Sequence, residues 1–201
     1  MDLREIARGL WYWTAPHPSW SGAADWPEDV GCVCCRTADA AVLIDPLLPK
    51  DEEAEFWAFV DRLRQPVAVL LTAAWHQRDA QLVAERYGTT VWAHELAAPR
   101  LSFPTRSDAL PEGVEAFVPD SDEEGQVALY LRAYQALVVA EFLMGTGEGL
   151  RVCPSPSIGD LEAFYGSLRR LLDLPIERVL VAHGEPVLVE GRRRIAEALA
   201  A

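Results

Sequence analysis

The sequence has no apolar run long enough to cross a membrane and no glycine-rich loop of the kind that binds phosphate. A transmembrane helix needs about 20 consecutive apolar residues, and no run of that length occurs. No Gly-rich turn follows a predicted strand, which argues against a nucleotide or flavin site. The N-terminus also lacks the basic start and apolar stretch of a signal peptide, and we therefore expect a cytoplasmic protein.

Basic residues are scarce beside acidic ones. The 201 residues include 18 Lys and Arg against 31 Asp and Glu, which gives a formal net charge of -13. An acidic surface repels phosphate backbones and anionic lipid headgroups. We therefore expect neither nucleic acid nor a membrane as a partner, and a small-molecule ligand is the partner class that the composition leaves open.

Cysteine is also rare, and its spacing gives no complete zinc-binding pattern. Of the four cysteines, Cys32, Cys34 and Cys35 lie close together, and Cys153 stands alone. A structural zinc site needs four ligands, and no second cluster supplies the rest. The three neighbouring cysteines alternate into an apolar strand, which predicts small buried thiols without a disulfide.

Apolar runs and helical periodicity alternate along the chain. Short unbroken apolar runs predict strands covered on both faces, and apolar residues spaced three and four apart predict helices. This order suits an α/β fold in which two mixed sheets are sandwiched by helices, in a single domain spanning residues 1–201. The predicted strands cover residues 30–36, 40–44, 67–71, 89–93, 114–118, 126–132, 136–140 and 178–182, and the predicted helices cover 51–64, 77–87, 160–172 and 191 onward.

Polar residues gather where three predicted strands end. Asp45 follows the strand over 40–44, the segment 72–79 follows the strand over 67–71, and His183 follows the strand over 178–182. The carboxyl ends of buried strands open onto crevices in α/β folds. These strand ends are therefore the places where a site is expected.

Taken in order, these strand ends resemble motifs of the metallo-β-lactamase superfamily, which includes glyoxalase II-like hydrolases. The resemblance covers most of the chain, from about residue 30 to the C-terminus. No single stretch is specific, whereas the ordered set is, and it implies a four-layer α/β/β/α sandwich with metal ligands at the strand ends. The matching stretches are Leu43-Ile44-Asp45-Pro46, Leu70-Leu71-Thr72, Tyr87 to His94, Leu137 to Glu141, and Ala182 to Pro186.

The metal motif of that superfamily, T-H-x-H-x-D-H, is mostly missing. One inserted residue would bring His76 and Asp79 to two of its ligand positions. A later histidine of the family has no equivalent in the segment 122–127, the bridging aspartate looks replaced by Glu141, and His183 is retained. Read without a gap from the threonine, the four ligand positions hold Ala73, Trp75, Gln77 and Arg78, none of which is a usual zinc ligand.

The remaining ligands can build at most one metal site. His76, Asp79, Glu141 and His183 would hold one Zn, Mn or Fe ion with two histidines and carboxylates, or the chain holds no ion. Each also has an ordinary structural interpretation. His183 can hydrogen-bond loop backbone, His76 can face solvent at a helix start, and Asp79 can pair with Arg78 or cap a helix.

Aromatic residues crowd the N-terminal segment 10–20. It holds three Trp, one Tyr and His17. Such side chains can line a ligand cleft, form a homodimer contact or pack over a sheet edge. The candidate pocket residues are His17, Trp75, Arg78 and Asp45, the last as a support that hydrogen-bonds neighbouring loops.

Two functions remain open. The first is a non-hydrolytic descendant that keeps the fold and a pocket, with a small-molecule-binding or structural role and no working metal centre. The second is a mononuclear hydrolase, in which a metal held by His76, Asp79 and His183, with Glu141 or His17, activates water against an ester or thioester, as the resemblance implies. The loss of several ligands at once favours the first function, and convergence of the candidate ligands on one point would favour the second.

Overall fold

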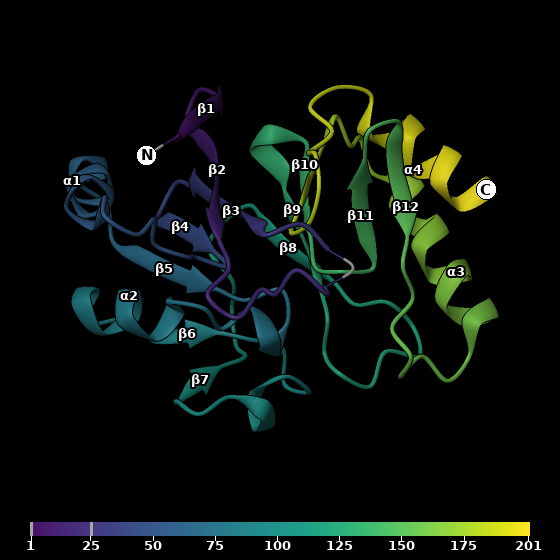
Figure 1. Ribbon diagram of the computed structural model, residues 1–201, viewed down its shortest axis with the longest axis horizontal. Coiled ribbons are helices and arrows are strands. Elements are labelled where there is room, and N and C mark those ends of the chain that lie inside the picture. Colours follow the sequence, from purple (N-terminus) through teal and green to yellow (C-terminus); the bar gives the residue numbers. More distant parts are fainter. Residues whose placement is uncertain (1, 25) are drawn as a thin grey trace.

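Two β-sheets lie face to face between two layers of helices in the computed structural model, which describes residues 2–24 and 26–201. Helices α1 (Glu53–Leu63) and α2 (Ala80–Tyr87) cover one sheet, and α3 (Leu161–Arg169) and α4 (Gly191–Ala200) cover the other (Figure 1). This is the predicted four-layer α/β/β/α sandwich, and the prediction is confirmed.

The first sheet has seven strands that follow one another in chain order. Strands β1 to β4 pair antiparallel, and β4 to β7 pair parallel. The parallel pairs are possible because α1 and α2 carry the chain back to the same end of the sheet. The strands are β1 (Arg4–Ala7), β2 (Leu10–Pro16), β3 (Asp29–Arg36), β4 (Ala41–Ile44), β5 (Val67–Leu70), β6 (Val91–Trp92) and β7 (Thr105–Arg106).

The second sheet has four strands in the order β13-β10-β9-β8. Strands β8, β9 and β10 form an antiparallel meander, and β13 joins β10 in parallel after α3. A separate hairpin, β11 and β12, lies beside this sheet (Figure 1). The strands are β8 (Val114–Phe117), β9 (Ala128–Leu131), β10 (Ala136–Val139), β11 (Leu143–Thr146), β12 (Gly149–Val152) and β13 (Arg178–Val181).

Alternating side chains of the strands fill three buried layers, because successive residues of a strand point to opposite faces. In β3, Cys34 belongs to the layer under α1 together with Phe56, whereas Cys35 belongs to the layer between the sheets. On the outer face of the second sheet, Val139 shares a layer with Phe164 of α3. The three neighbouring cysteines are free and buried, as predicted.

The differences from the predicted elements have local causes. The helix predicted from residue 77 begins only at Ala80, because Ala74–His76 form a short 3-10 turn. Strand β2 was not predicted, because its aromatic residues were interpreted as a cleft wall, a homodimer contact or packing over a sheet edge. The β11–β12 hairpin was missed because its glycines weaken the strand pattern. Asp160 caps α3, with its carboxylate accepting from the Ala163 N–H at 3.0 Å.

Three further 3-10 turns lie at Ala98–Arg100, Arg132–Tyr134 and Arg170–Asp173. The last of these continues α3, so the predicted helix over residues 160–172 is α-helical for most of its length and tightens at its end. Within the described part of the chain, no helix combines the length and apolarity needed to cross a bilayer.

The two sheets meet where β3 passes the end of β13. The Gly31 N–H donates to the Ala182 carbonyl at 2.8 Å, and Val30 forms an isolated bridge with His183. A Cβ on Gly31 would collide with the Val181 carbonyl oxygen. A residue without a side chain is therefore required at this junction, which also fixes the start of the loop that carries His183.

We expect Gly31→Ala to lower the free energy of unfolding by about 1–3 kcal/mol, the usual cost of forcing extra volume into a packed position. Gly159→Ala is the matched control, because nothing lies within 4 Å of the place its Cβ would occupy. Urea unfolding followed by tryptophan fluorescence measures both. Equal stability of the two variants would show that the junction tolerates a side chain.

The native protein should expose one reactive thiol to a disulfide reagent at neutral pH. Burial raises the pKa of Cys32 to about 11 and that of Cys35 to about 12, and it raises the pKa of Cys34 as well. Cys153 is partly exposed. We expect a titration of thiols to find one fast-reacting group, lost in Cys153→Ser, and the other three only after unfolding. Several fast thiols in the native protein would contradict the burial of the strand.

Candidate metal centre

His76 is held in place by a buried carboxylate. Asp45, which follows β4, accepts the Thr72 backbone N–H at 2.8 Å and the Thr72 hydroxyl. The second oxygen of this carboxylate lies 3.0 Å from His76 Nδ1. Because a carboxylate accepts hydrogen bonds, Nδ1 carries the proton, and the lone pair of His76 is on Nε2.

The charges of this group stabilise one another despite burial. Burial by itself would raise the pKa of Asp45, but the neighbouring charges of His76 and Arg78, with the Thr72 hydrogen bond, hold that pKa below its usual value. Burial would likewise lower the pKa of His76, but the Asp45 carboxylate outweighs it and raises that pKa. The result is a buried carboxylate–imidazole pair beside the end of β5.

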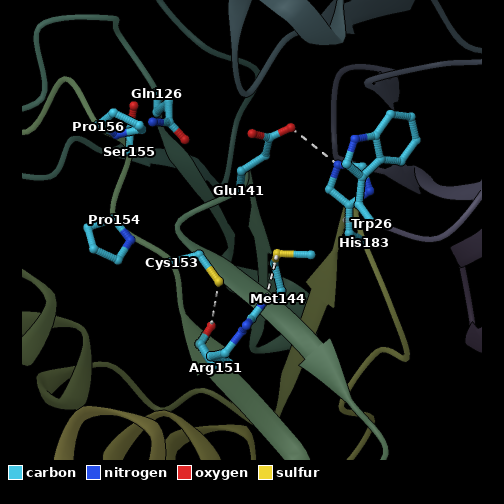
Figure 2. A pocket seen from close by; sticks show the side chains of 10 residues that line it. All are labelled: Trp26, Gln126, Glu141, Met144, Arg151, Cys153, Pro154, Ser155, Pro156 and His183. Atoms are coloured by element: carbon cyan, nitrogen blue, oxygen red, sulfur yellow. Dashed lines mark hydrogen bonds and ion pairs between the residues drawn. The ribbon is translucent and has the colours of Figure 1, made fainter. Parts of the chain in front are cut away.

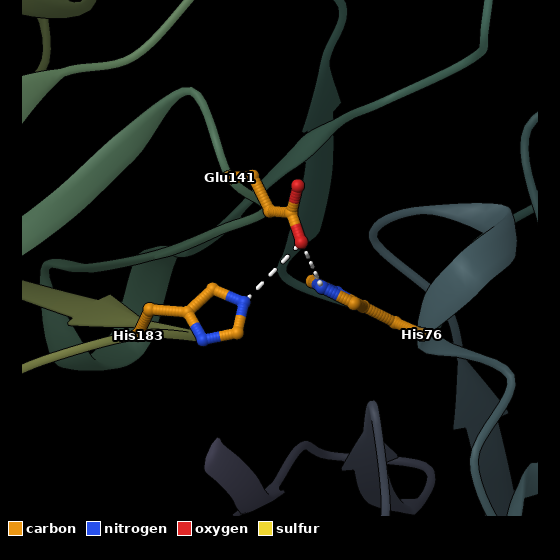
Figure 3. A group of neighbouring side chains, drawn as sticks. All are labelled: His76, Glu141 and His183. Atoms are coloured by element: carbon orange, nitrogen blue, oxygen red, sulfur yellow. Dashed lines mark hydrogen bonds and ion pairs between the residues drawn. The ribbon is translucent and has the colours of Figure 1, made fainter. Parts of the chain in front are cut away.

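Glu141 and His183 come from the second sheet and meet His76. Strands β10 and β13 are parallel neighbours, so Glu141 and His183, which follow them, lie at the same edge. Glu141 Oε1 lies 3.2 Å from His183 Nε2 and 3.6 Å from His76 Nε2 (Figure 3). One ligand atom from each of the three side chains lies within 4.8 Å of the others. Burial would raise the pKa of Glu141, but the two histidines lower it well below its usual value.

Trp26 covers the outer side of this group. Its ring lies 4.9 Å from the His183 ring and 5.4 Å from the His17 ring, between centroids. The Trp26 carbonyl accepts the Trp20 indole N–H at 2.9 Å, which ties the N-terminal segment together. The aromatic segment therefore contributes one wall of the site as well as a strand of the sheet.

The three side chains fit a divalent metal ion. Atoms bound to one ion at about 2.1 Å lie at most about 4.2 Å apart, so the group needs only a small contraction. His76 Nε2 and His183 Nδ1 are buried and have no hydrogen-bond partner among the described residues. Two imidazoles and a carboxylate suit Zn, Mn or Fe, and a carboxylate behind His76 is the support that metal-binding histidines normally have.

The other candidate residues lie around this centre without joining it. The structure does not bring Asp79 into the group, because its carboxylate accepts the Leu48 N–H at 2.7 Å. Arg78 donates from Nη1 to the carbonyls of Gly31 at 2.7 Å and Asp45 at 2.8 Å. Trp75 lies 6.2 Å from the His76 ring, between centroids, and its buried indole N–H has no partner in residues 2–24 and 26–201.

The remaining pocket candidate, His17, packs edge-on against Trp26. Its pKa is lowered, first by partial burial and then by the nearby Arg78 charge. His17 therefore lies near the centre as part of the aromatic wall, outside the group of three converging side chains.

A pocket of about 310 Å³ opens beside the metal centre (Figure 2). Glu141 and His183 form part of its wall, and the rest comes from Trp26, Gln126, the β11–β12 hairpin and the segment 153–156. Sequence reasoning missed Gln126, since the segment 122–127 was noted only for lacking a histidine. Gln126 could have been predicted as a pocket residue, because it is a polar residue just before a buried strand, at the end that opens onto the crevice.

No protein-family model matches the chain, and no curated protein matches it. Solved structures do match over nearly its full length. A metallo-β-lactamase from Pontibacter korlensis has a TM-score of 0.72 and 19% identity, over 99% of this chain and 98% of that chain. A metallo-β-lactamase from Erythrobacter litoralis, with β-mercaptoethanol in its active site, has a TM-score of 0.72 and 15% identity, over 98% and 95%.

A metallo-β-lactamase family protein from Thermus thermophilus is similar as well, with a TM-score of 0.63 and 18% identity, over 97% of this chain and 79% of that chain. At sequence identities below 20%, this similarity establishes a shared fold and nothing further. The chain has the metallo-β-lactamase fold, which confirms the resemblance of its ordered strand ends at the level of structure.

Replacing Asp45 by asparagine should destabilise the protein. The amide keeps one acceptor but loses the charge that His76 and Thr72 face, and a hydrogen bond to a buried charge contributes about 1.5–3 kcal/mol. We expect the free energy of unfolding of Asp45→Asn to fall by about this amount. Asp120→Asn is the matched control, because Asp120 pairs with Arg170 on the surface and should change stability by no more than about 1 kcal/mol. If both variants lost a similar free energy of unfolding in urea, the buried pair would not contribute to stability.

Proposed function

We propose that this protein is a mononuclear metal-dependent hydrolase, which holds one divalent ion with His76, Glu141 and His183 and acts on an ester or thioester. The proposal is supported above all by the convergence of these three side chains beside a pocket. Catalytic zinc sites commonly have three protein ligands and leave a position for water. The ligands left in this chain are therefore sufficient in number.

The chain prepares each ligand in a different way. Asp45 keeps the proton of His76 on Nδ1, so that Nε2 can offer its lone pair. The neighbouring ring of Trp26 restricts the movement of His183. The Glu141 side chain is 41% exposed and reaches in from the pocket, so it has the freedom to make the contraction that metal binding requires.

Hydrolysis in this site would divide the chemistry between the ion and Glu141. When bound, a divalent ion polarises a carbonyl oxygen and lowers the pKa of a water molecule. In the reaction, the water oxygen bonds to the acyl carbon, the C–O or C–S bond breaks, and the leaving alcohol or thiol takes up a proton. Glu141 would hold the ion through Oε1, which contacts both histidines, and its other oxygen, Oε2, would remain to accept and return that proton.

One observation favours a second function, metal-free binding of a small molecule. Glu141 Oε1 already contacts both histidine rings, so the three side chains are partly satisfied as a hydrogen-bonded group. In that case the pocket would bind its ligand without hydrolysis. The metal content of the protein separates the two functions.

We expect protein loaded with Zn, Mn or Fe and then dialysed to retain one ion per chain by elemental analysis. His76→Ala and His183→Ala each remove an imidazole ligand, so the metal content of either variant should fall close to zero. His94→Ala is the matched control, because His94 lies outside the converging group. Full metal content in the His183→Ala variant would rule out this centre, and a wild type that holds no metal would favour the second function.

Metal-loaded wild type should hydrolyse an activated ester or thioester faster than the metal-free protein. Glu141→Gln keeps the shape of the side chain but removes its negative charge and its capacity to accept a proton. We expect kcat to fall by roughly 100-fold or more, the usual contribution of a general base. Because Glu141 is also a proposed ligand, kcat is expressed per bound ion. A variant as active per ion as the wild type would assign the proton transfer to another group.

A further inference from the structure

The side chain of Gln126 is buried in the wall of this pocket. It is 3% exposed, and its oxygen Oε1 is buried and meets no donor among the described residues. It lines the same pocket as Glu141 and His183. In Figure 2, Gln126 lies on the side of Glu141 that faces away from His183.

The backbone around Gln126 is tightly fixed. The Gln126 N–H donates to Asp122 Oδ2 at 2.6 Å, and the next residue, Val127, donates its N–H to the Thr72 carbonyl at 2.8 Å. Gly125, just before it, has a φ of +75°, a conformation that favours glycine. These contacts connect Gln126 to the strand end that carries His76, so its side chain has a defined position relative to the metal centre.

Among the residues that the structure describes, the adjacent wall gives the Gln126 oxygen no hydrogen-bond donor. Ser155, the hydroxyl residue on that wall, donates to Glu124 Oε2 at 2.9 Å. Glu124 in turn pairs with Arg100 at 3.0 Å. Ser155 is therefore already hydrogen-bonded, and the Gln126 oxygen is left to accept from a molecule that enters the pocket.

We infer that the pocket accepts an acyl group that carries an amide, and that Gln126 is the residue that recognises this amide. The inference rests on the proposed hydrolase function and narrows its substrate class. A carboxamide has an acceptor oxygen and a donor NH₂ group, and its natural complement is a second amide with an N–H and a C=O. An acyl group without an N–H would leave the buried oxygen of Gln126 unpaired, and sites built in this way discriminate strongly against such analogues.

The direction of the pocket agrees with this assignment. With the reacting carbonyl at the metal centre, an acyl chain that follows the pocket past Glu141 extends toward Gln126 (Figure 2). The amide of the substrate would thus lie in the acyl part, on the far side of Glu141 from His183. Gln126 contacts the bound substrate and determines specificity, and it takes no part in the proton transfer.

The test compares two probes that differ in one group. The p-nitrophenyl esters of N-acetylglycine and levulinic acid have acyl chains of equal length, with an N–H in the first and a CH₂ in the second. We expect metal-loaded wild type to prefer the amide ester in kcat/KM, and Gln126→Leu to reduce this preference by roughly tenfold or more. The ratio of kcat/KM for the two esters is compared between wild type and variants, so the intrinsic reactivity of each ester cancels. Gln81→Leu, at an exposed position of α2, is the matched control and should retain the wild-type preference.

Binding of the two free acids provides a second readout that does not depend on turnover. Calorimetry should show N-acetylglycine binding wild type more tightly than levulinate, with the difference lost in Gln126→Leu and in the unbranched Gln126→Met. Equal preference in wild type and both variants would overturn the inference and leave the hydrolase intact. Absence of metal-dependent hydrolysis would instead overturn the proposed function, and the binding difference would still decide the role of Gln126.

Discussion

The buried carboxylate of Asp45 is the group on which the rest of the site depends. A charge in this position is costly unless it is paired and hydrogen-bonded. Thr72 and His76 provide the pairing on the carboxylate, while Arg78 holds the Asp45 carbonyl at 2.8 Å and the Gly31 carbonyl at 2.7 Å. The ends of three strands of the first sheet are therefore tied together around one ion pair, and His76 has a single orientation as a result.

The centre lies at the seam between the two sheets. His76 comes from the first sheet, whereas Glu141 and His183 come from parallel strands of the second. The seam is kept narrow by the backbone contact between Gly31 and Ala182 at 2.8 Å. The packing of sheet on sheet, which is driven by burial of apolar side chains, thus also determines the distance between the candidate metal ligands.

The candidate centre has fewer converging ligands than the two metal sites that the superfamily motifs imply. Three donors converge, and Asp79, a fourth candidate, instead holds the Leu48 backbone N–H. Three ligands suffice for one catalytic ion and leave a position for water. In the adjacent pocket, the buried oxygen of Gln126 has no hydrogen-bond partner among the described residues, which is the basis for the proposed recognition of a substrate amide.

Much of the fold follows from local pattern. Apolar runs, helical spacing and the alternation of the cysteine strand predicted most of the strands and helices, because these signals arise from neighbouring residues. The same patterns predicted His183 as a candidate ligand and Asp45 as a support for neighbouring loops. It left open whether His76 faces solvent, and it grouped Asp79 with the ligands.

Only the tertiary structure decided those points. Glu141 and His183 are separated by 42 residues, and Asp45 and His76 by 31, so their meeting depends on how the two sheets pack and in which register their strands pair. Spacing along a chain cannot show which of several polar side chains will find a closer backbone partner, as Asp79 does. The sequence by itself determined the layers and the inventory of possible ligands, and packing selected which of them converge.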